Sequence, residues 1–225
     1  MSDASGVLAT LLHADPAFAS GASSFSSGLE TLVSDGYVRT ESELVGVMID
    51  AASLRWNSFD RVFLARAFAA GDDLDRIAVD EDVERSTLGA DARRASRRAG
   101  GALLGTWARL GSTEVTRYRG LVQDGTTLGH LSVAQGIVFA SNGLDLAAAE
   151  NLACWSVLSG FASGAVRLGV VGHRSAQTAL LDAQEALAPL LATRVDPLAT
   201  PMAWTPVIDI AVERHAYADM RLFAS

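Results

Sequence analysis

Helical periodicity runs through almost the whole chain. Apolar residues recur at three- and four-residue spacing in one segment after another, and no run alternates in the manner of a β-strand. The clearest helix covers 41–70, which Thr40 and Glu43 can open with a capping box, and an acidic turn at 72–75 follows it. Further helices are expected over 83–110, 113–123, 130–140, 145–167, 175–191 and 208–220. The pattern predicts an all-α, single-domain bundle of about eight to ten helices over residues 1–225.

Composition removes several classes of function. The 225 residues are 49% apolar, which is enough to bury a core without a disulfide or a metal. All 18 basic residues are arginine, and the formal net charge is −8. A chain without lysine cannot be a P-loop nucleotidase or a Schiff-base enzyme, because both need a lysine amine. The acidic balance also argues against nucleic-acid binding, which favours basic domains.

The most hydrophobic stretch is 152–171, which is long enough to suggest a membrane span. Arg167 interrupts it, and serine and glycine make one side small and polar, so a buried helix of a bundle fits better. Cys154 lies in this stretch and is expected to be a small buried hydrophobe. As the only cysteine it excludes an intramolecular disulfide and a cysteine-built zinc site. We see no signal peptide and expect a cytoplasmic protein with no membrane segment.

The charged residues form no recognisable catalytic or metal motif. The four histidines are His13, His130, His173 and His215, and no two have the spacing of a local ligand pair. The acidic cluster 80–84 lacks the glycine and ligand spacing of a calcium loop, so we interpret it as the solvated start of a helix. Arginines at 93, 94, 97 and 98 would form a positive stripe on a helix. The stripe is either a solvated face or a docking site for an acidic partner.

The segment 15–30 is dense in glycine and serine. It looks like a phosphate cradle, but no strand precedes it and no lysine accompanies it. From composition alone it is an irregular turn into a helix that Ser26 or Ser27 can cap and that contains Glu30.

This segment is also the first of four blocks that resemble the urease accessory protein F (UreF) family. The family pattern is Asp-x-x-Phe-Pro-x-Gly-x-aromatic-x-His-Ser-x-Gly-Leu-Glu. This chain matches it at Asp15, Phe18, Gly21, Ser26, Gly28, Leu29 and Glu30. Ala19, Ser23 and Phe25 replace the proline, the aromatic residue and the histidine of that pattern.

The other three blocks follow in the order that the family shows. Residues 130–136 resemble His-Leu-Pro-Val-Ala-x-Gly, beginning at His130. Residues 165–177 resemble Ala-Val-Arg-Leu-x-Pro-Leu-Gly-Gln, with Arg167 and Gln177 inside the segment. The end of the chain resembles the closing Asp-Ile-Ala, His and Arg-Leu-Phe-x-Ser, at Asp209, His215, Arg221, Leu222, Phe223 and Ser225. The blocks span nearly the whole chain, and the lost prolines and histidine mark a divergent member.

The resemblance implies an all-α homodimer that is not an enzyme. Such a protein bridges a UreD/UreH-type accessory protein and the UreG-type GTPase, and it regulates the GTPase during nickel insertion into apo-urease. It implies no intrinsic cofactor, with nickel handled transiently by the complex. The absence of lysine agrees with this, because the chain would then bind the GTPase and would not itself hydrolyse a nucleotide.

The matched residues become the candidate partner-binding set: Asp15, Phe18, Gly21, Ser26, Gly28, Glu30, His130, Arg167, Gln177, Asp209, His215, Arg221, Leu222 and Phe223. Among them Glu30 is expected to be an exposed partner contact. Arg167 is expected to be buried in an apolar helix and to have a carboxylate or carbonyl partner there, as in a buried ion pair. The region 196–225 is expected to form a proline-rich loop, a helix and a docking tail. The tail offers an arginine beside two apolar side chains, which are residue types favoured at interfaces.

Two other interpretations stay open at this stage. One is a UreF-like helical dimer that serves another complex. The other is a helical enzyme that uses His130 or His215 with a nearby carboxylate as an acid–base pair, and it predicts a pocket around that histidine.

Overall fold

The described chain is helical from end to end, as the periodicity predicts. The computed structural model describes residues 4–15, 18 and 27–215, and every regular element within them is a helix. The chain forms two compact units, each assembled from separate segments. Unit 1 holds the described residues of 1–21 together with 60–153 and 194–201, and unit 2 holds those of 22–59, 154–193 and 202–225. The expectation of one domain over 1–225 stays a prediction.

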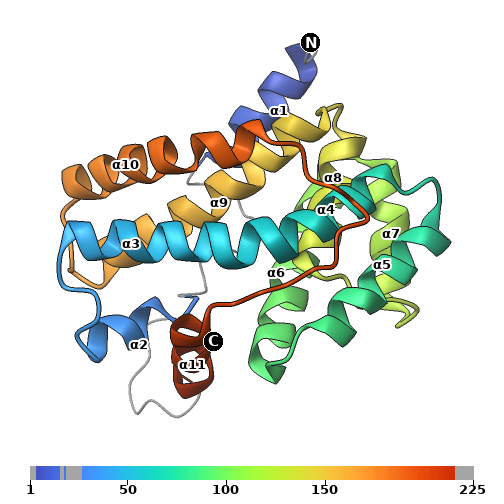
Figure 1. Ribbon diagram of the computed structural model, residues 1–225. Coiled ribbons are helices and arrows are strands. Elements are labelled where there is room, and N and C mark those ends of the chain that lie inside the picture. Colours follow the sequence, from blue (N-terminus) through green and yellow to red (C-terminus); the bar gives the residue numbers. More distant parts are fainter. Residues whose placement is uncertain (1–3, 16–17, 19–26, 216–225) are drawn as a thin grey trace. The chain divides into compact units, whose positions relative to one another are not determined.

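Unit 1 is built mainly from consecutive helices. These are α4 (Arg61–Ala69), α5 (Asp73–Ser86), α6 (Ala90–Arg109), α7 (Thr113–Gln123) and α8 (Leu131–Ser141), with α1 (Ala4–Ala14) and the first part of α9 (Leu146–Arg167). Helix α8 packs against α4 and α6, and α7 packs against α6 (Figure 1). Phe63, Leu104 and Ile137 are fully buried, so α8 forms the centre of this unit.

Unit 2 joins early and late segments of the chain. It contains α2 (Leu29–Ser34), α3 (Glu41–Ala51), most of the π-helix η2 (Ala52–Asp60), the rest of α9, α10 (His173–Ala192) and α11 (Pro206–His215). Helix α10 runs beside α3, and α11 packs against α2 (Figure 1). Leu29, Leu44 and Met48 are fully buried within it. Each of these pairs therefore brings together segments that are far apart in the sequence.

Several local predictions are confirmed. Thr40 and Glu43 form the expected capping box, in which the Glu43 N–H donates to Thr40 Oγ1 at 3.3 Å and the Thr40 N–H donates to Glu43 Oε2 at 3.0 Å. The helix they open continues through α3, η2 and α4 to Ala69, although its π-helical middle was not predicted. Cys154 is buried, as expected. No helix in the described ranges combines the length and hydropathy that a bilayer span requires.

Other boundaries were wrong. The expected helix over 83–110 is broken at 87–89, where Arg93 Nη1 donates to the Thr87 and Leu88 carbonyls at 2.6 and 3.0 Å and fixes a turn between α5 and α6. The acidic turn at 72–75 is instead the start of α5, because the Asp72 side chain accepts from the Asp75 N–H at 3.0 Å. The final helix begins at Pro206, and its continuation to 220 lies outside the described residues.

Candidate functional site

The second signature block places His130 inside unit 1, at the start of α8. The ring is completely buried, with Nε2 at 2.8 Å from Glu84 Oε2 and Nδ1 at 3.1 Å from Ser96 Oγ. Ser96 Oγ also accepts from the Leu131 N–H at 3.1 Å. This arrangement suits a neutral imidazole whose Nε2–H donates to Glu84 while Nδ1 accepts from the Ser96 hydroxyl. His130 therefore ties α8 to both α5 and α6.

Asp80 of α5 anchors the turn that leads into His130. Its side chain is fully buried and accepts from four donors: the Thr127 hydroxyl at 2.6 Å and the N–H groups of Leu128, Gly129 and His130 at 2.7, 2.7 and 2.8 Å. Gly100 of α6 packs against the same turn, because a Cβ there would collide with the Gly129 carbonyl oxygen. Glycine at this position therefore lets α6 approach the turn closely.

Glu84 connects this turn to the arginine stripe. Its Oε1 lies 3.3 Å from Arg93 Nε and 2.8 Å from Arg97 Nη2. Arg94 pairs with Asp91 on its own helix. The interpretation of 80–84 as a solvated helix start was therefore wrong: these residues lie in the middle of α5, and Asp80 and Glu84 face its neighbours. Arg93 and Arg97 of the stripe are internal partners rather than a free docking face.

Burial favours the neutral form of the His130 ring. It lowers the pKa of His130 below its ordinary value, an effect that the nearby carboxylates of Asp80 and Glu84 oppose. The ring is thus held neutral in the fold while it keeps both hydrogen bonds. It has a carboxylate partner of the kind an acid–base enzyme needs, but at 0% exposure it offers no surface to a substrate.

The first and last signature blocks meet in unit 2, where His215 of α11 contacts Glu30 of α2. Their Nε2 and Oε2 atoms are 2.7 Å apart, and the two side chains are 2% and 14% exposed. The expectation that Glu30 is exposed was therefore wrong, because His215 of α11 covers it, and its role as a partner contact stays a prediction. Arg214 and Asp35 form an ion pair between the same two segments.

Gly28 explains how α2 and α11 approach so closely. It precedes α2 with φ +82°, and a Cβ there would lie 3.1 Å from the Ile208 carbonyl oxygen and 3.2 Å from Ala211 Cβ. Both the backbone angle and the space favour glycine. Among the described residues no side chain caps α2, so the cap expected from Ser27 does not form; Ser26 lies outside them.

Phe18 of the first block belongs to an aromatic cluster in unit 1. Its ring centroid lies 5.0 Å from that of His13 and 5.7 Å from that of Trp107, and His13 also meets Phe139 edge-on at 5.0 Å. Burial lowers the pKa of His13 to about 4. Asp15, three residues before Phe18, is exposed. Gly21 lies outside the described residues.

Three further candidates, Arg167, Gln177 and Asp209, lie at exposed positions of unit 2. Arg167 is exposed in the last turn of α9, so the expectation that it is buried was wrong. Gln177 is exposed on α10. Asp209 of α11 accepts from the Thr205 hydroxyl at 3.2 Å. The tail residues Arg221, Leu222 and Phe223 lie outside the described residues.

The structure brings Gly28, Glu30 and His215 together, whereas His130 has different partners in unit 1. The sequence reasoning missed Asp80, Glu84 and Ser96 as those partners. The four-residue spacing of Asp80 and Glu84, which puts both on one helix face, was the available signal. Within the described ranges, no three His, Cys, Asp or Glu side chains gather in a way that could hold a metal ion.

Comparison with known proteins gives a consistent result. A protein-family model described as UreF matches residues 30–184. The chain is 32% identical to the urease accessory protein UreF of Agrobacterium fabrum over the full length of both chains. It is 28% identical to the protein of that name from Trichodesmium erythraeum, over 100% of this chain and 99% of the relative. The UreF of Paenarthrobacter aurescens is 27% identical over 94% of each chain.

Proposed function

Because this chain belongs to the UreF family of urease accessory proteins, we propose that it is a scaffold for nickel insertion into apo-urease. In this role it acts as a homodimer, bridges a UreD/UreH-type accessory protein and the UreG-type GTPase, and regulates the GTPase. Nickel is the cargo of the assembly, and the chain itself performs no catalysis.

The observation that carries the proposal is the contact between Glu30 and His215. These residues come from the first and last signature blocks, 185 positions apart, and they meet at 2.7 Å within unit 2. The shared motif residues thus fold the chain rather than line a reaction site. This is what a protein needs when its function is to present a surface to partners.

The burial of both signature histidines disfavours the enzyme alternative. His130 and His215 each have a glutamate partner, but their rings are 0% and 2% exposed. A general acid or base must reach its substrate directly or through one water. A pocket in unit 1 is lined by the residues around the α6–α7 turn and the end of α8, and it contains no histidine.

The experiment that tests the function is reconstitution. The purified chain is mixed with the UreD/UreH-type protein and the UreG-type GTPase, with a GTP analogue and nickel, and the products are separated by size exclusion with mass measurement. We expect a joint complex larger than any pair. Omitting the nucleotide analogue is the control for assembly that does not depend on the GTPase state. Failure to associate with either protein would contradict the scaffold function and favour another complex.

A further inference from the structure

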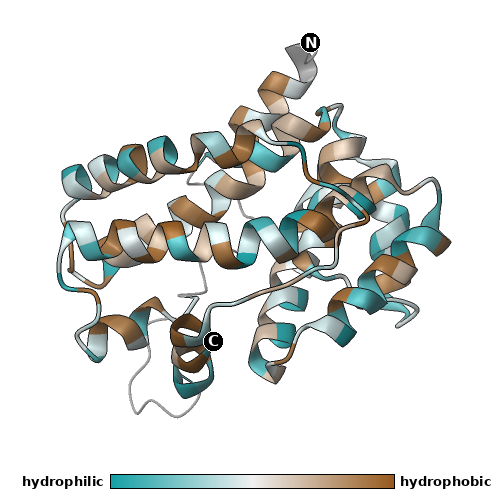
Figure 2. Cartoon of the chain, viewed as in Figure 1, coloured by the Kyte–Doolittle hydropathy of each residue, from teal (hydrophilic) through white to brown (hydrophobic). Residues whose placement is uncertain are grey.

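Unit 2 exposes five large apolar side chains on two neighbouring segments. One is Leu54 of η2, which is 42% exposed, and the other four lie in or just before α11. Those four are Met202 (65% exposed), Trp204 (73%), Val207 (54%) and Ile210 (59%). We call this set the Trp204 surface. Figure 2 shows that hydrophobic residues recur along α11. Contiguous exposed apolar surface of this kind marks interaction sites more often than scattered single residues do.

The backbone joins these residues into one surface. The Met202 N–H donates to the Ser58 carbonyl and the Trp204 N–H to the Leu54 carbonyl, each at 2.9 Å, so the segment before α11 is fixed along the π-helix. Val207 and Ile210 are three residues apart in α11, which places them next to each other on one face of that helix, and Trp204 lies just before the helix begins. The surface is therefore formed before any partner arrives, which reduces the ordering cost of binding.

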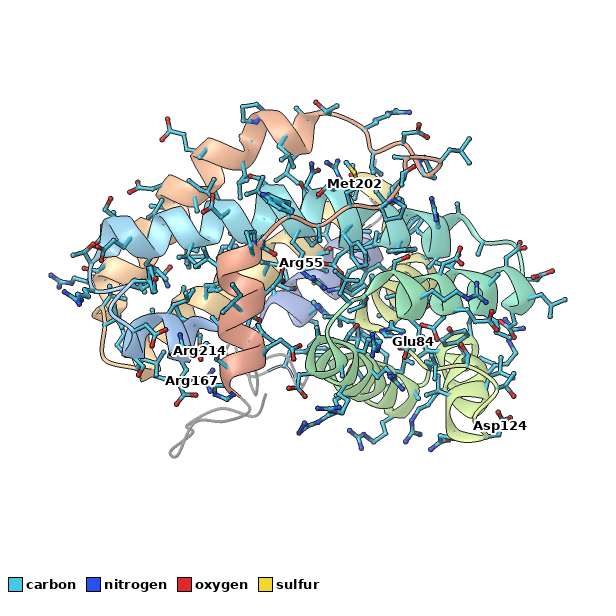
Figure 3. The ribbon with its side chains drawn as sticks, turned by 60° about the horizontal axis from the view of Figure 1, so that its bottom comes forward. Arg55, Glu84, Asp124, Arg167, Met202 and Arg214 are labelled. Atoms are coloured by element: carbon cyan, nitrogen blue, oxygen red, sulfur yellow. The ribbon has the colours of Figure 1, made fainter. Side chains whose placement is uncertain are left out.

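A long ion pair links η2 and α11 beside the Trp204 surface. Arg55 of η2 lies 4.0 Å from Asp209 of α11 and 5.2 Å from the Phe59 ring centroid. Figure 3 shows Arg55 beside α11 and Met202 on the segment that leads into it. Arg55 is only 28% exposed and already faces a carboxylate, so it adds little positive charge to the surface.

The charges around the surface are mainly negative. Asp50 lies four residues before Leu54, and Glu213 lies three residues after Ile210; both are exposed. Arg214 is also near Ile210 in the helix, but its guanidinium pairs with Asp35. The whole chain carries −8. A second copy would therefore meet like charges around the apolar centre, whereas a basic partner would meet opposite ones.

We propose that the Trp204 surface is a docking site for a protein whose own apolar surface is bordered by lysine or arginine side chains. This inference rests on the proposed function and specifies it: one of the two accessory partners must present that chemistry. Tryptophan and methionine at the centre with charge at the edge are the composition expected of such an interface.

The test measures binding of the full chain to each purified partner separately, the UreD/UreH-type protein and the UreG-type GTPase. The variant Trp204→Ser/Ile210→Ser is expected to weaken binding to one of them by about tenfold or more, because anchors in an interface centre dominate affinity. Leu181→Ser is the matched control, since Leu181 is 65% exposed on α10 of the same unit, and it should change affinity by less than about twofold. Both variants should unfold thermally like the wild type.

A charge variant tests the chemistry of the partner. Asp50→Lys/Glu213→Lys should slow association with that partner and weaken its dependence on salt, because the steering charge is reversed. Unchanged affinity in Trp204→Ser/Ile210→Ser, with the wild type binding, would overturn the docking inference and leave the scaffold function intact. A wild type that binds neither partner would overturn the scaffold function and the docking inference with it. A dimer that dissociates in the double variant would instead assign this surface to a second copy and refute the proposed partner.

Discussion

The two units each contain a buried histidine–glutamate contact, but the contacts serve different purposes. His130 and Glu84 are 46 residues apart, and both ring nitrogens of His130 are engaged. His215 and Glu30 are 185 residues apart, and His215 Nδ1 has no hydrogen-bond partner among the residues the structure describes. Unit 1 thus surrounds its histidine with a polar network that engages both ring nitrogens, whereas unit 2 joins an early and a late segment of the chain with a few contacts. The comparison predicts that the largest loss of stability in unit 1 comes from removing a buried polar group. In unit 2 it predicts that the largest loss comes from a change that prevents two helices from packing closely.

The largest effect is expected from Asp80→Ala in unit 1. The substitution leaves three backbone N–H groups and the Thr127 hydroxyl without their buried acceptor. Losing one side of such a network costs about 3–5 kcal/mol. The measurement is the free energy of unfolding in urea. Glu81→Ala, one position along and exposed on the same helix, is the control and should cost less than about 0.5 kcal/mol. Equal losses in the two variants would show that the Asp80 contacts contribute little.

The corresponding change in unit 2 is Gly28→Ala. It forces a side chain into the left-handed region and against Ile208 and Ala211, and we expect a loss of about 2 kcal/mol in the free energy of unfolding. Gly46→Ala is the control with the opposite sign, because Gly46 lies within α3 with open space around it. It should stabilise by about 0.5–1 kcal/mol. A neutral Gly28→Ala would mean that α2 and α11 are not packed as closely as described.

These two predictions show which parts of the architecture the sequence could supply. Helical periodicity and the Thr40–Glu43 box predict α3 correctly because the required interactions lie within one or two turns. Asp80 was misinterpreted because an acidic residue in an acidic stretch is ordinarily exposed, and its donors come from a turn almost 50 residues later. The break at 87–89 escaped prediction for a similar reason, since it contains no proline and depends on Arg93.

The signature blocks located the candidate residues but not their roles. The motif pattern singled out Glu30, His130 and His215, yet it could not reveal that each is covered by another element. Exposure depends on which helices pack together, and that is set by contacts such as the one between α2 and α11. The Trp204 surface was missed because its members come from two distant segments, and each is ordinary on its own.

A smaller effect is expected from acid, which should lower the stability of unit 1 through His13. Burial lowers the pKa of His13 to about 4, below the unfolded value of about 6.5. The unfolded chain therefore binds the proton first, and stability falls as the pH drops below about 6.5 and towards 4. Lowering the pH from about 7 to about 5.5 should reduce the free energy of unfolding of the wild type by about 1 kcal/mol through His13. In His13→Gln the free energy of unfolding should fall by that much less between the two pH values. His173→Gln, at an exposed position on α10, is the control. An unchanged difference in His13→Gln would show that the buried ring does not make unit 1 sensitive to acid.

The smallest effect is expected from Asp35→Asn, which removes the ion pair with Arg214 between α2 and α11. The two side chains are 24% and 59% exposed, so solvent and salt screen their attraction and the loss should stay below about 0.5 kcal/mol. Urea unfolding at low and at high salt measures it, and the difference from the wild type should shrink further at high salt. Because Gly28→Ala acts at the same contact between helices, the pair of variants separates backbone fit from surface charge. An Asp35→Asn loss as large as that of Gly28→Ala would reverse the proposed order and make the ion pair a principal link between the two ends of the chain.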